Sequence, residues 1–224
     1  MRIVVRVGGS VVASPVNVDL VREYVDVLIR IRRMGHGVAA VVGGGALARD
    51  FIAVAKELGL DEEAQDELAI SVSRLFAQLF MKKLGRMGCR MVPLTVEDAV
   101  TCFMNGRIPV MGGLKPGMTT DTVAALVSEA LGADLLIKGT DQDGIYDKDP
   151  RKHADAVKLD RVSVEDLSRI LAEEVHKAGI HQVIDPEAVK ILKRRRFKLV
   201  VVNGFKPENL LAVVEGRNVG TVVE

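Results

Sequence analysis

The sequence predicts an α/β protein whose mostly parallel sheet carries helices on both faces. Two patterns predict this class. Short apolar runs rich in β-branched residues alternate with segments of helical periodicity, and several runs are apolar at consecutive positions, as in strands covered on both faces. The candidate strands are residues 2–7, 38–42, 90–93, 109–111, 135–137, 198–202 and 219–223.

The candidate helices fill the intervals between these strands. They are residues 18–34, 46–58, 62–84, 96–105, 120–131, 163–178, 186–195 and 208–215. Thr95 and Ser163 each precede an acidic residue three positions on, which is the pattern of a capping box. Asp185-Pro186 combines a good N-cap residue with proline at the first helical position.

Length and composition limit the class of protein. The 224 residues are enough for one substantial core, and we expect a single domain, 1–224. No run approaches the ~20 apolar residues of a membrane span. The chain opens into a strand-like run without a signal peptide, so we expect a cytoplasmic location. The 31 Lys and Arg residues balance 30 Asp and Glu, which gives no general attraction to nucleic acid or membranes.

The cysteines and histidines do not indicate a metal centre. Cys89 and Cys102 lack the spacing of a metal or redox site, and we expect two reduced, half-buried thiols. The four histidines are scattered without a zinc-ligand pattern, so no protein metal site is expected. They are His36, His153, His176 and His181.

Glycine clusters follow three of the candidate strands. They are Gly8-Gly9-Ser10, Gly43-Gly44-Gly45 and Gly112-Gly113, and Gly139 and Gly144 frame another turn. In an open parallel sheet, ligands bind outside the carboxyl ends of the strands. Glycine there lets backbone N–H groups approach an anion, and a following helix N-terminus adds a favourable dipole. Glycine also simply permits tight turns, but three clusters favour phosphate binding over turn geometry alone.

The two common phosphate-binding signatures are missing from these turns. None reads G-x-x-x-x-G-K-[ST], which excludes a P-loop. None reads G-x-G-x-x-G between a first strand and its helix, so the dinucleotide-binding fold is unsupported.

The order of these motifs resembles the amino-acid-kinase superfamily. The matching residues are Gly8-Gly9-Ser10, Gly43-Gly44-Gly45 with Ala48-Arg49, Met111-Gly112-Gly113, Thr119-Thr120-Asp121 with Ala124-Ala125, Asp143-Gly144-Ile145-Tyr146, Asp149-Pro150 and Gly220-Thr221. The segments 116–121 and 183–186 look specifically like archaeal uridylate kinases. The resemblance covers essentially the whole chain.

This resemblance implies a three-layer αβα sandwich with an open, eight-stranded sheet. The implied activity is transfer of the γ-phosphoryl group of ATP to UMP, which gives UDP. The N-terminal part would bind the acceptor and the C-terminal part ATP, with Mg²⁺ carried by the nucleotide. A homo-oligomer, namely a hexamer built as a trimer of dimers, is also implied. Leu68, Val72, Leu75 and Leu79 fall at helical spacing and are expected in the core or a subunit interface.

The resemblance also implies roles for individual residues. The catalytic set is Arg6, Gly8, Gly9 and Asp121; the UMP-binding set is Gly44, Gly45, Arg49, Asp66, Met118, Thr119 and Thr120; the ATP-binding set is Gly9, Ser10, Lys138, Thr140, Asp141, Gly144, Tyr146 and Asp149. Relatives commonly carry lysine in place of Arg6. They usually carry asparagine in place of Asp141, and this extra carboxylate puts the donor preference in question.

Simpler interpretations of these residues remain open on the sequence alone. Arg6 could be a surface charge, Arg49 a solvated helix arginine, and Asp66 a helix-surface acid. Asp121 could merely favour a helix N-terminus, although Thr119-Thr120 could cap that helix without it.

Other functions of the same fold also remain open. One alternative is a kinase of an acyl carboxylate, a carbamate or an isoprenoid phosphate, and another is an oxyanion-storage protein. Isoprenoid phosphate kinases usually carry histidine beside the triple glycine, and acetylglutamate-type enzymes carry lysine where this chain has Asp185. Neither feature is present in the sequence, and a storage protein would need histidine-rich and acid-rich pockets.

Overall fold

The computed structural model describes residues 1–175, 184–195 and 197–224. Its strands are β1 (Arg2–Val7), β2 (Gly37–Val42), β3 (Val110–Met111), β4 (Leu135–Thr140), β5 (Ile145–Tyr146), β6 (Lys158–Leu159), β7 (Arg161–Val162), β8 (Lys198–Asn203) and β9 (Thr221–Val223). The helices are α1 (Gly9–Val12), α2 (Val18–Arg33), α3 (Gly45–Glu57), α4 (Glu62–Leu84), α5 (Val96–Met104), α6 (Thr120–Leu131), α7 (Val164–Val175), α8 (Pro186–Arg195) and α9 (Glu208–Val214), with a 3₁₀ turn, η1, at Gly85–Met87.

Seven strands of the described residues form one sheet in the order β3-β2-β1-β4-β8-β9-β7. All neighbouring pairs are parallel except β8 and β9. The predicted class and helical layers are therefore confirmed, whereas the implied count of eight strands is wrong for the described residues. β5 and β6 pair separately as a small antiparallel ribbon.

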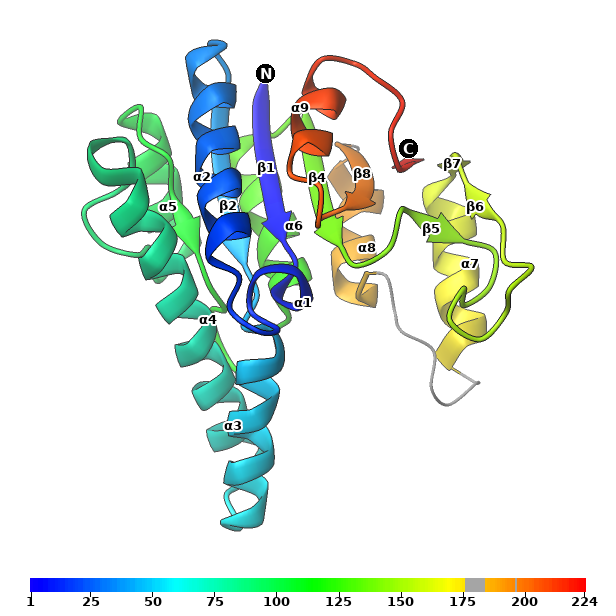
Figure 1. Cartoon of the computed structure of the whole chain (residues 1–224), viewed down its shortest axis with the longest axis horizontal. Coiled ribbons are helices and arrows are strands. Elements are labelled where there is room, and N and C mark those ends of the chain that lie inside the picture. The colour runs from blue at the N-terminus through cyan, green and yellow to red at the C-terminus, as the bar shows by residue number, and fades with distance from the viewer. Residues whose placement is uncertain (176–183, 196) are drawn as a thin grey trace.

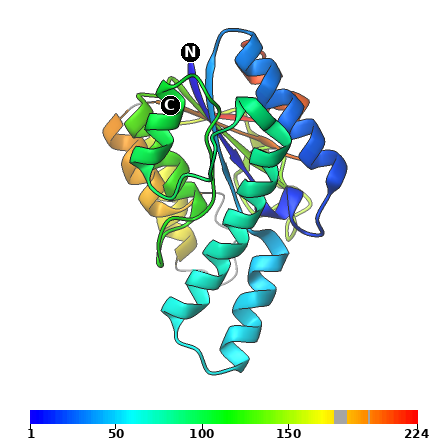
Figure 2. The same ribbon diagram turned by 90° about the vertical axis from the view of Figure 1, so that its left-hand side faces the viewer.

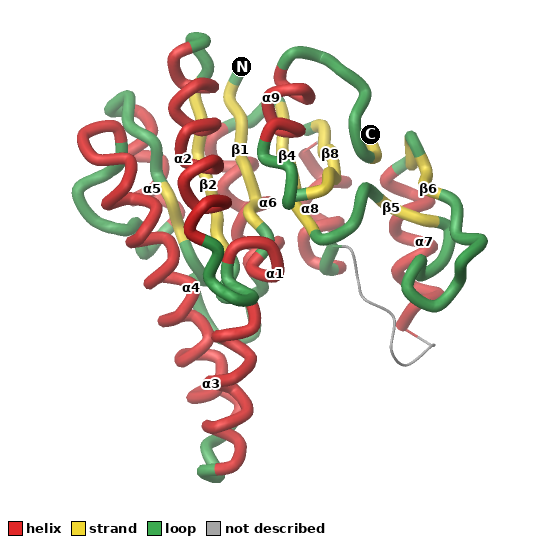
Figure 3. Tube along the Cα trace, in the orientation of Figure 1, coloured by secondary structure: helices red, strands yellow, loops and turns green. Residues whose placement is uncertain are grey.

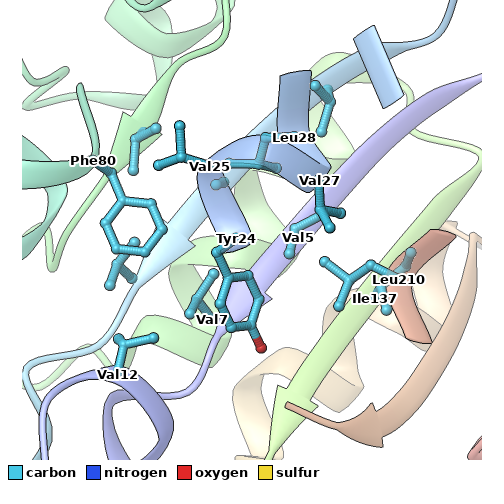
Figure 4. Packing of buried hydrophobic residues seen from close by; sticks show 14 of the residues in the cluster. Val5, Val7, Val12, Tyr24, Val25, Val27, Leu28, Phe80, Ile137 and Leu210 are labelled. Carbon is cyan, nitrogen blue, oxygen red and sulfur yellow. The ribbon is translucent and has the colours of Figure 1, made fainter. Parts of the chain in front are cut away.

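Helices cover both faces of this sheet (Figure 1, Figure 3). One apolar core lies between the sheet and α2, α4 and α9, and the other lies between the sheet and α5, α6, α7 and α8. Figure 4 shows the first core, in which Tyr24 of α2 lies beside Val7. The Tyr24 hydroxyl donates to the Gly204 carbonyl over 2.8 Å, so burial of this phenol leaves no unpaired polar group. Burial also raises the pKa of Tyr24 well above its usual value.

The helix termini follow the predicted capping residues. Thr95 and Asp98 form a reciprocal capping box at the start of α5. The Ser163 hydroxyl accepts from the Asp166 N–H, and Asp185 accepts from the Ala188 N–H at the start of α8. The end predicted for the helix at 163–178 lies outside the described residues, as do His176 and His181.

The predicted strand at residues 90–93 is wrong, because that segment is irregular. Only an isolated bridge forms nearby, between Gly88 and Ile108. Pro93 lacks the N–H that a ladder needs, and Met91 is 80% exposed, so an apolar run without a covering layer remains a loop.

The expectation of two reduced thiols is also wrong, because Cys89 and Cys102 are joined in a disulfide. Their Cα atoms lie 5.9 Å apart, within the usual range for such bonds. The bond joins the segment after η1 to α5.

Two further features concern the outline of the molecule. The helices α3 and α4 extend beyond the sheet as a hairpin (Figure 1, Figure 2). None of the helices that the structure describes is both long and apolar enough to cross a membrane.

Candidate active site

A cavity of about 810 Å³ opens where β1, β2 and β4 reach their carboxyl ends. It brings together residues from three glycine-containing turns and from the start of α6. The lining residues are Arg6, Gly9, Ser10, Gly43, Gly44, Gly45, Arg49, Ile52, Thr119, Thr120, Asp121, Lys138, Thr140, Asp141, Gln142, Gly144, Tyr146, Lys148, Asp149, Pro150 and Arg151.

A network of three charged side chains forms one wall of the cavity. The β1–β4 register sets Arg6 beside Lys138, so both side chains leave the same face of the sheet. That face is covered by α6, whose first turn carries Asp121. Arg6 Nε lies 2.7 Å from Asp121 Oδ1, and the two groups form an ion pair without the alignment of a hydrogen bond. Lys138 Nζ donates a hydrogen bond to Asp121 Oδ2.

These three groups are largely removed from water. The exposed fractions of the side chains are 17% for Arg6, 11% for Asp121 and 6% for Lys138. Burial raises the pKa of Asp121, but the charges of Arg6 and Lys138 outweigh it, so the pKa lies below its usual value. Burial, assisted by Arg6, lowers the pKa of Lys138 against the opposing effect of Asp121. The carboxylate therefore holds two cations at the cavity wall.

Asp121 is not needed as the cap of its own helix. Thr119 caps α6 by accepting hydrogen bonds from the N–H groups of Asp121 and Thr122, each over 3.2 Å. Thr119 and Thr122 in turn donate to Asp185, and Arg6 Nη2 donates to Thr120 Oγ1 over 3.1 Å. The capping interpretation of Asp121 therefore loses its support, and the carboxylate remains free to organise the cations.

The first two glycine turns touch backbone to backbone. A Cβ on Gly9 would lie 2.2 Å from the Gly45 nitrogen, and one on Gly45 would lie 2.3 Å from the Gly9 oxygen. Gly45 also has φ +61°, which glycine adopts at little cost. Part of the reason for glycine here is therefore close packing.

The two glycines of the first turn have different positions. Gly9 lines the cavity and Gly8 does not. The Gly8 N–H donates to the Gly139 carbonyl over 3.0 Å, so it is not available to a phosphate in this structure. Gly8, which is expected in the catalytic set, therefore lies outside the cavity lining, whereas Gly9 lies within it.

Of the residues predicted to bind UMP, five line the cavity, namely Gly44, Gly45, Arg49, Thr119 and Thr120, whereas two do not. Asp66 Oδ2 accepts from the Gly117 N–H over 2.7 Å, which ties α4 to the loop before α6. Met118 packs against the second apolar core.

The loop before α6 is held by further bonds to α4. Arg74 donates to the carbonyls of Gly113 and Leu114, and Ser73 Oγ accepts from the Gly113 N–H over 2.7 Å. The third glycine cluster thus packs against α4 and does not line the cavity.

Every residue that is predicted to bind ATP lines the cavity. These residues are Gly9, Ser10, Lys138, Thr140, Asp141, Gly144, Tyr146 and Asp149. Sequence reasoning missed Ile52, Gln142, Lys148 and Arg151. Arg151 Nη2 lies 2.6 Å from Asp141 Oδ2, so the unusual carboxylate has a cationic partner. The available signal was the position of Arg151 directly after the Asp149-Pro150 motif.

The described residues offer no ready-made metal cage. Among them, no three or more His, Cys, Asp or Glu side chains are grouped to hold an ion. Both oxygens of Asp121 face cations, while Asp141 and Asp149 also line the cavity. This donor set fits Mg²⁺ that arrives on nucleotide phosphates, with a carboxylate or water completing its shell.

Known proteins resemble this chain over its full length. The model of the Amino acid kinase family matches residues 1–203. The chain is 43% identical to a uridylate kinase from Methanocaldococcus jannaschii and 41% identical to one from Thermococcus kodakarensis, with all of both chains covered in each case. The crystal structure of uridylate kinase from Archaeoglobus fulgidus has a TM-score of 0.91 at 37% identity, again over both whole chains. The chain therefore belongs to the amino acid kinase family, in the group of archaeal proteins named uridylate kinase.

Proposed function

We propose that this protein is an ATP-dependent uridylate kinase, which transfers the γ-phosphoryl group of ATP to UMP and gives UDP and ADP. One observation carries the proposal beyond family membership. Arg6 and Lys138 are held by Asp121 at the wall of a cavity that is bordered by two glycine turns. Phosphoryl transfer needs this kind of fixed positive charge, because its transition state spreads negative charge over the transferred oxygens.

The cavity residues divide between the two substrates. Gly44, Gly45 and Arg49 lie on the side of α3 and would bind the UMP phosphate. Arginine is suited to this role through its planar set of donors. The loop from Thr140 to Arg151 would bind ATP, together with Gly9 and Ser10. Both groups line the same cavity, which supports transfer between two phosphates that are bound there.

No general base is required in this reaction. The phosphate of UMP is already anionic at neutral pH, so its oxygen can attack without losing a proton. Arg6 and Lys138 would lie beside the transferred group, and Asp121 would position both. Mg²⁺ supplies charge neutralisation on the ATP phosphates when it is bound.

The alternative substrates lack a supporting observation. Among the described residues that line the cavity there is no histidine. The same lining argues against an oxyanion store, which needs histidine-rich and acid-rich pockets.

The assembly and setting of the enzyme are also proposals. Large apolar side chains are exposed along the α3–α4 hairpin, and such patches favour protein contacts. These side chains are Phe51, Val54, Leu58, Leu60, Leu75 and Leu79. They support a homo-oligomer formed through this hairpin, and the hexamer remains a prediction. A role in pyrimidine nucleotide biosynthesis in the cytoplasm follows from the proposed substrates.

The test is chromatographic detection of products from ATP, Mg²⁺ and one acceptor at a time. The acceptors are UMP, CMP, dUMP, AMP, acetylglutamate and isopentenyl phosphate. We expect UDP from UMP, loss of turnover in Arg6→Ala, and unchanged turnover in Arg22→Ala, which removes an exposed arginine of α2. Turnover of another acceptor in preference to UMP would reject the assignment.

A further inference from the structure

A second ion pair spans two segments on the donor side of the cavity. Asp141 directly follows β4, and Arg151 lies in the loop between β5 and β6. Arg151 Nη2 and Asp141 Oδ2 lie 2.6 Å apart, and both residues line the cavity. The two side chains are 42% and 30% exposed, so they are reachable by a bound ligand.

The carboxylate of Asp141 is an unfavourable neighbour for a polyphosphate. A negative charge within several ångströms of phosphate oxygens repels them, and the repulsion strengthens where protein displaces water. Five cations and three carboxylates line the cavity, so the lining as a whole favours an anion. Close to Asp141, however, the balance depends on its own partner.

Three other cations of the cavity have partners elsewhere, and Arg49 lies on α3. Arg6 and Lys138 face Asp121, and Lys148 Nζ lies 2.5 Å from Asp155. Among the described residues, Asp141 forms its ion pair with Arg151. Its backbone is held as well, because the Arg151 N–H donates to Asp149 Oδ1 over 3.0 Å.

We propose that Arg151 is a charge-compensating residue of the donor site, which neutralises Asp141 so that the triphosphate of ATP can bind beside a carboxylate. The inference rests on the proposed function only in that ATP is the donor. An exposed ion pair contributes little to folding, so the pair serves the ligand rather than stability. The compensation acts on ligand charge, and its effect must therefore grow with the number of phosphates.

The experiment is calorimetric titration of adenosine, ADP and ATP, with Mg²⁺ and without acceptor. The variants are Arg151→Ala, Arg151→Lys, Asp141→Asn and the double variant Asp141→Asn/Arg151→Ala. Arg161→Ala is the matched control, because it breaks an exposed ion pair with Glu224 and removes the same charge outside the cavity. Thermal melting of each variant establishes that it is folded.

We expect Arg151→Ala to weaken ATP binding about tenfold, which is close to the strength of a charge contact screened by water, because the two side chains are 42% and 30% exposed. ADP should lose less, and adenosine should be unchanged. Arg151→Lys should keep most of the affinity, and Asp141→Asn alone should bind ATP at least as tightly as the parent protein. The double variant should recover most of the loss, because the unpaired carboxylate is gone.

Three results would overturn the inference. They are an equal loss for adenosine and ATP, a double variant as weak as Arg151→Ala, and weaker ATP binding in Asp141→Asn. Product analysis of the parent protein separates this inference from the proposed function. Intact ATP binding without UMP turnover rejects the uridylate assignment and leaves the role of Arg151 standing. UMP turnover with unchanged ATP affinity in Arg151→Ala rejects the role of Arg151 alone.

Discussion

Replacing Asp121 by asparagine removes the negative charge that lies between Arg6 and Lys138. Asparagine preserves the shape of the side chain, so the change tests charge more than packing. Both cations remain, and their exposed fractions of 17% and 6% leave little water to solvate them. Removing one member of a buried ion pair typically costs ~3–5 kcal/mol.

The expected loss of stability is large enough to measure by thermal unfolding. A domain of this length loses about 2–4 °C of melting temperature per kcal/mol. Asp121→Asn should therefore melt on the order of 10 °C below the parent protein. Turnover should fall by about 10²–10³-fold, as it does when a positioned charge-stabilising group is lost.

The pH dependence of this loss identifies its cause. Burial and Arg6 already lower the pKa of Lys138, and Asp121 opposes that shift. Without Asp121, Lys138 gives up its proton more readily in the folded state than in the unfolded state. The unfolded chain then binds more protons, so stability rises with pH. The melting deficit of Asp121→Asn should shrink as pH increases toward the ordinary pKa of lysine.

Calorimetry of three variants completes the test. Asp121→Asn/Lys138→Met replaces one stranded cation by an apolar chain and should recover part of the stability without recovering turnover. Asp26→Asn removes an exposed aspartate of α2 and serves as the control. A melting temperature of Asp121→Asn within about 2 °C of the parent protein at every pH would refute the reasoning, since that is less than 1 kcal/mol.

Three further predictions concern other parts of the structure. In urea denaturation, Gly45→Ala should lower the free energy of unfolding by at least about 2 kcal/mol more than Gly59→Ala does. Both glycines have positive φ, but of the two only Gly45 lacks space for a Cβ. Equal losses would contradict the packing explanation. The pKa of Asp121 is lowered, so its contribution to stability is complete above the carboxyl pKa of the unfolded chain and is lost only as pH falls through the lower folded pKa. The melting temperature should therefore show no loss from this group at about pH 5–7. A loss in that range that Asp121→Asn abolishes would contradict the lowered pKa. The double variant Cys89→Ser/Cys102→Ser should lose about 3 kcal/mol of unfolding free energy, because the disulfide closes a loop over a 13-residue separation. Reductant should cause the same loss in the parent protein and none in the double variant. A parent protein whose stability does not respond to reductant would show that the bond does not form in solution.

Much of the fold follows from local patterns in the sequence. The helices at residues 62–84, 120–131 and 186–195 have the predicted bounds. In each of them the signal for a helix start stands where the helical apolar periodicity begins. Asp185 illustrates the point, since it caps α8 as its place before Pro186 predicts. Convergence of the first two glycine turns also follows, because parallel strands end at the same edge of the sheet.

Features that depend on distant partners could not be predicted in this way. Residues 90–93 have the composition of a strand, but none of the strands that the structure describes pairs with them. β7 and the β5–β6 ribbon have two residues per strand, too short for any periodicity to register. The disulfide depends on how α5 packs, which the spacing of the two cysteines does not encode.

The candidate site shows the same division. Motif order finds cavity-lining residues well between Lys138 and Asp149, because these residues lie in one continuous segment. Asp66 and Met118 match binding positions in the motif pattern, but Asp66 bonds to the loop before α6 and Met118 packs against the second apolar core. Arg151 was missed because its significance lies in a partner ten residues away. Single-residue roles thus depend on side-chain direction, which a linear motif does not contain.

The contact between Gly9 and Gly45 limits how the enzyme can move during a catalytic cycle. Because the two turns meet without intervening side chains, neither can move toward the other without a backbone clash. The floor of the cavity therefore cannot contract between these two turns. Any closing motion must be made by the rim, namely the α3–α4 hairpin and the loop that carries Asp141 and Arg151.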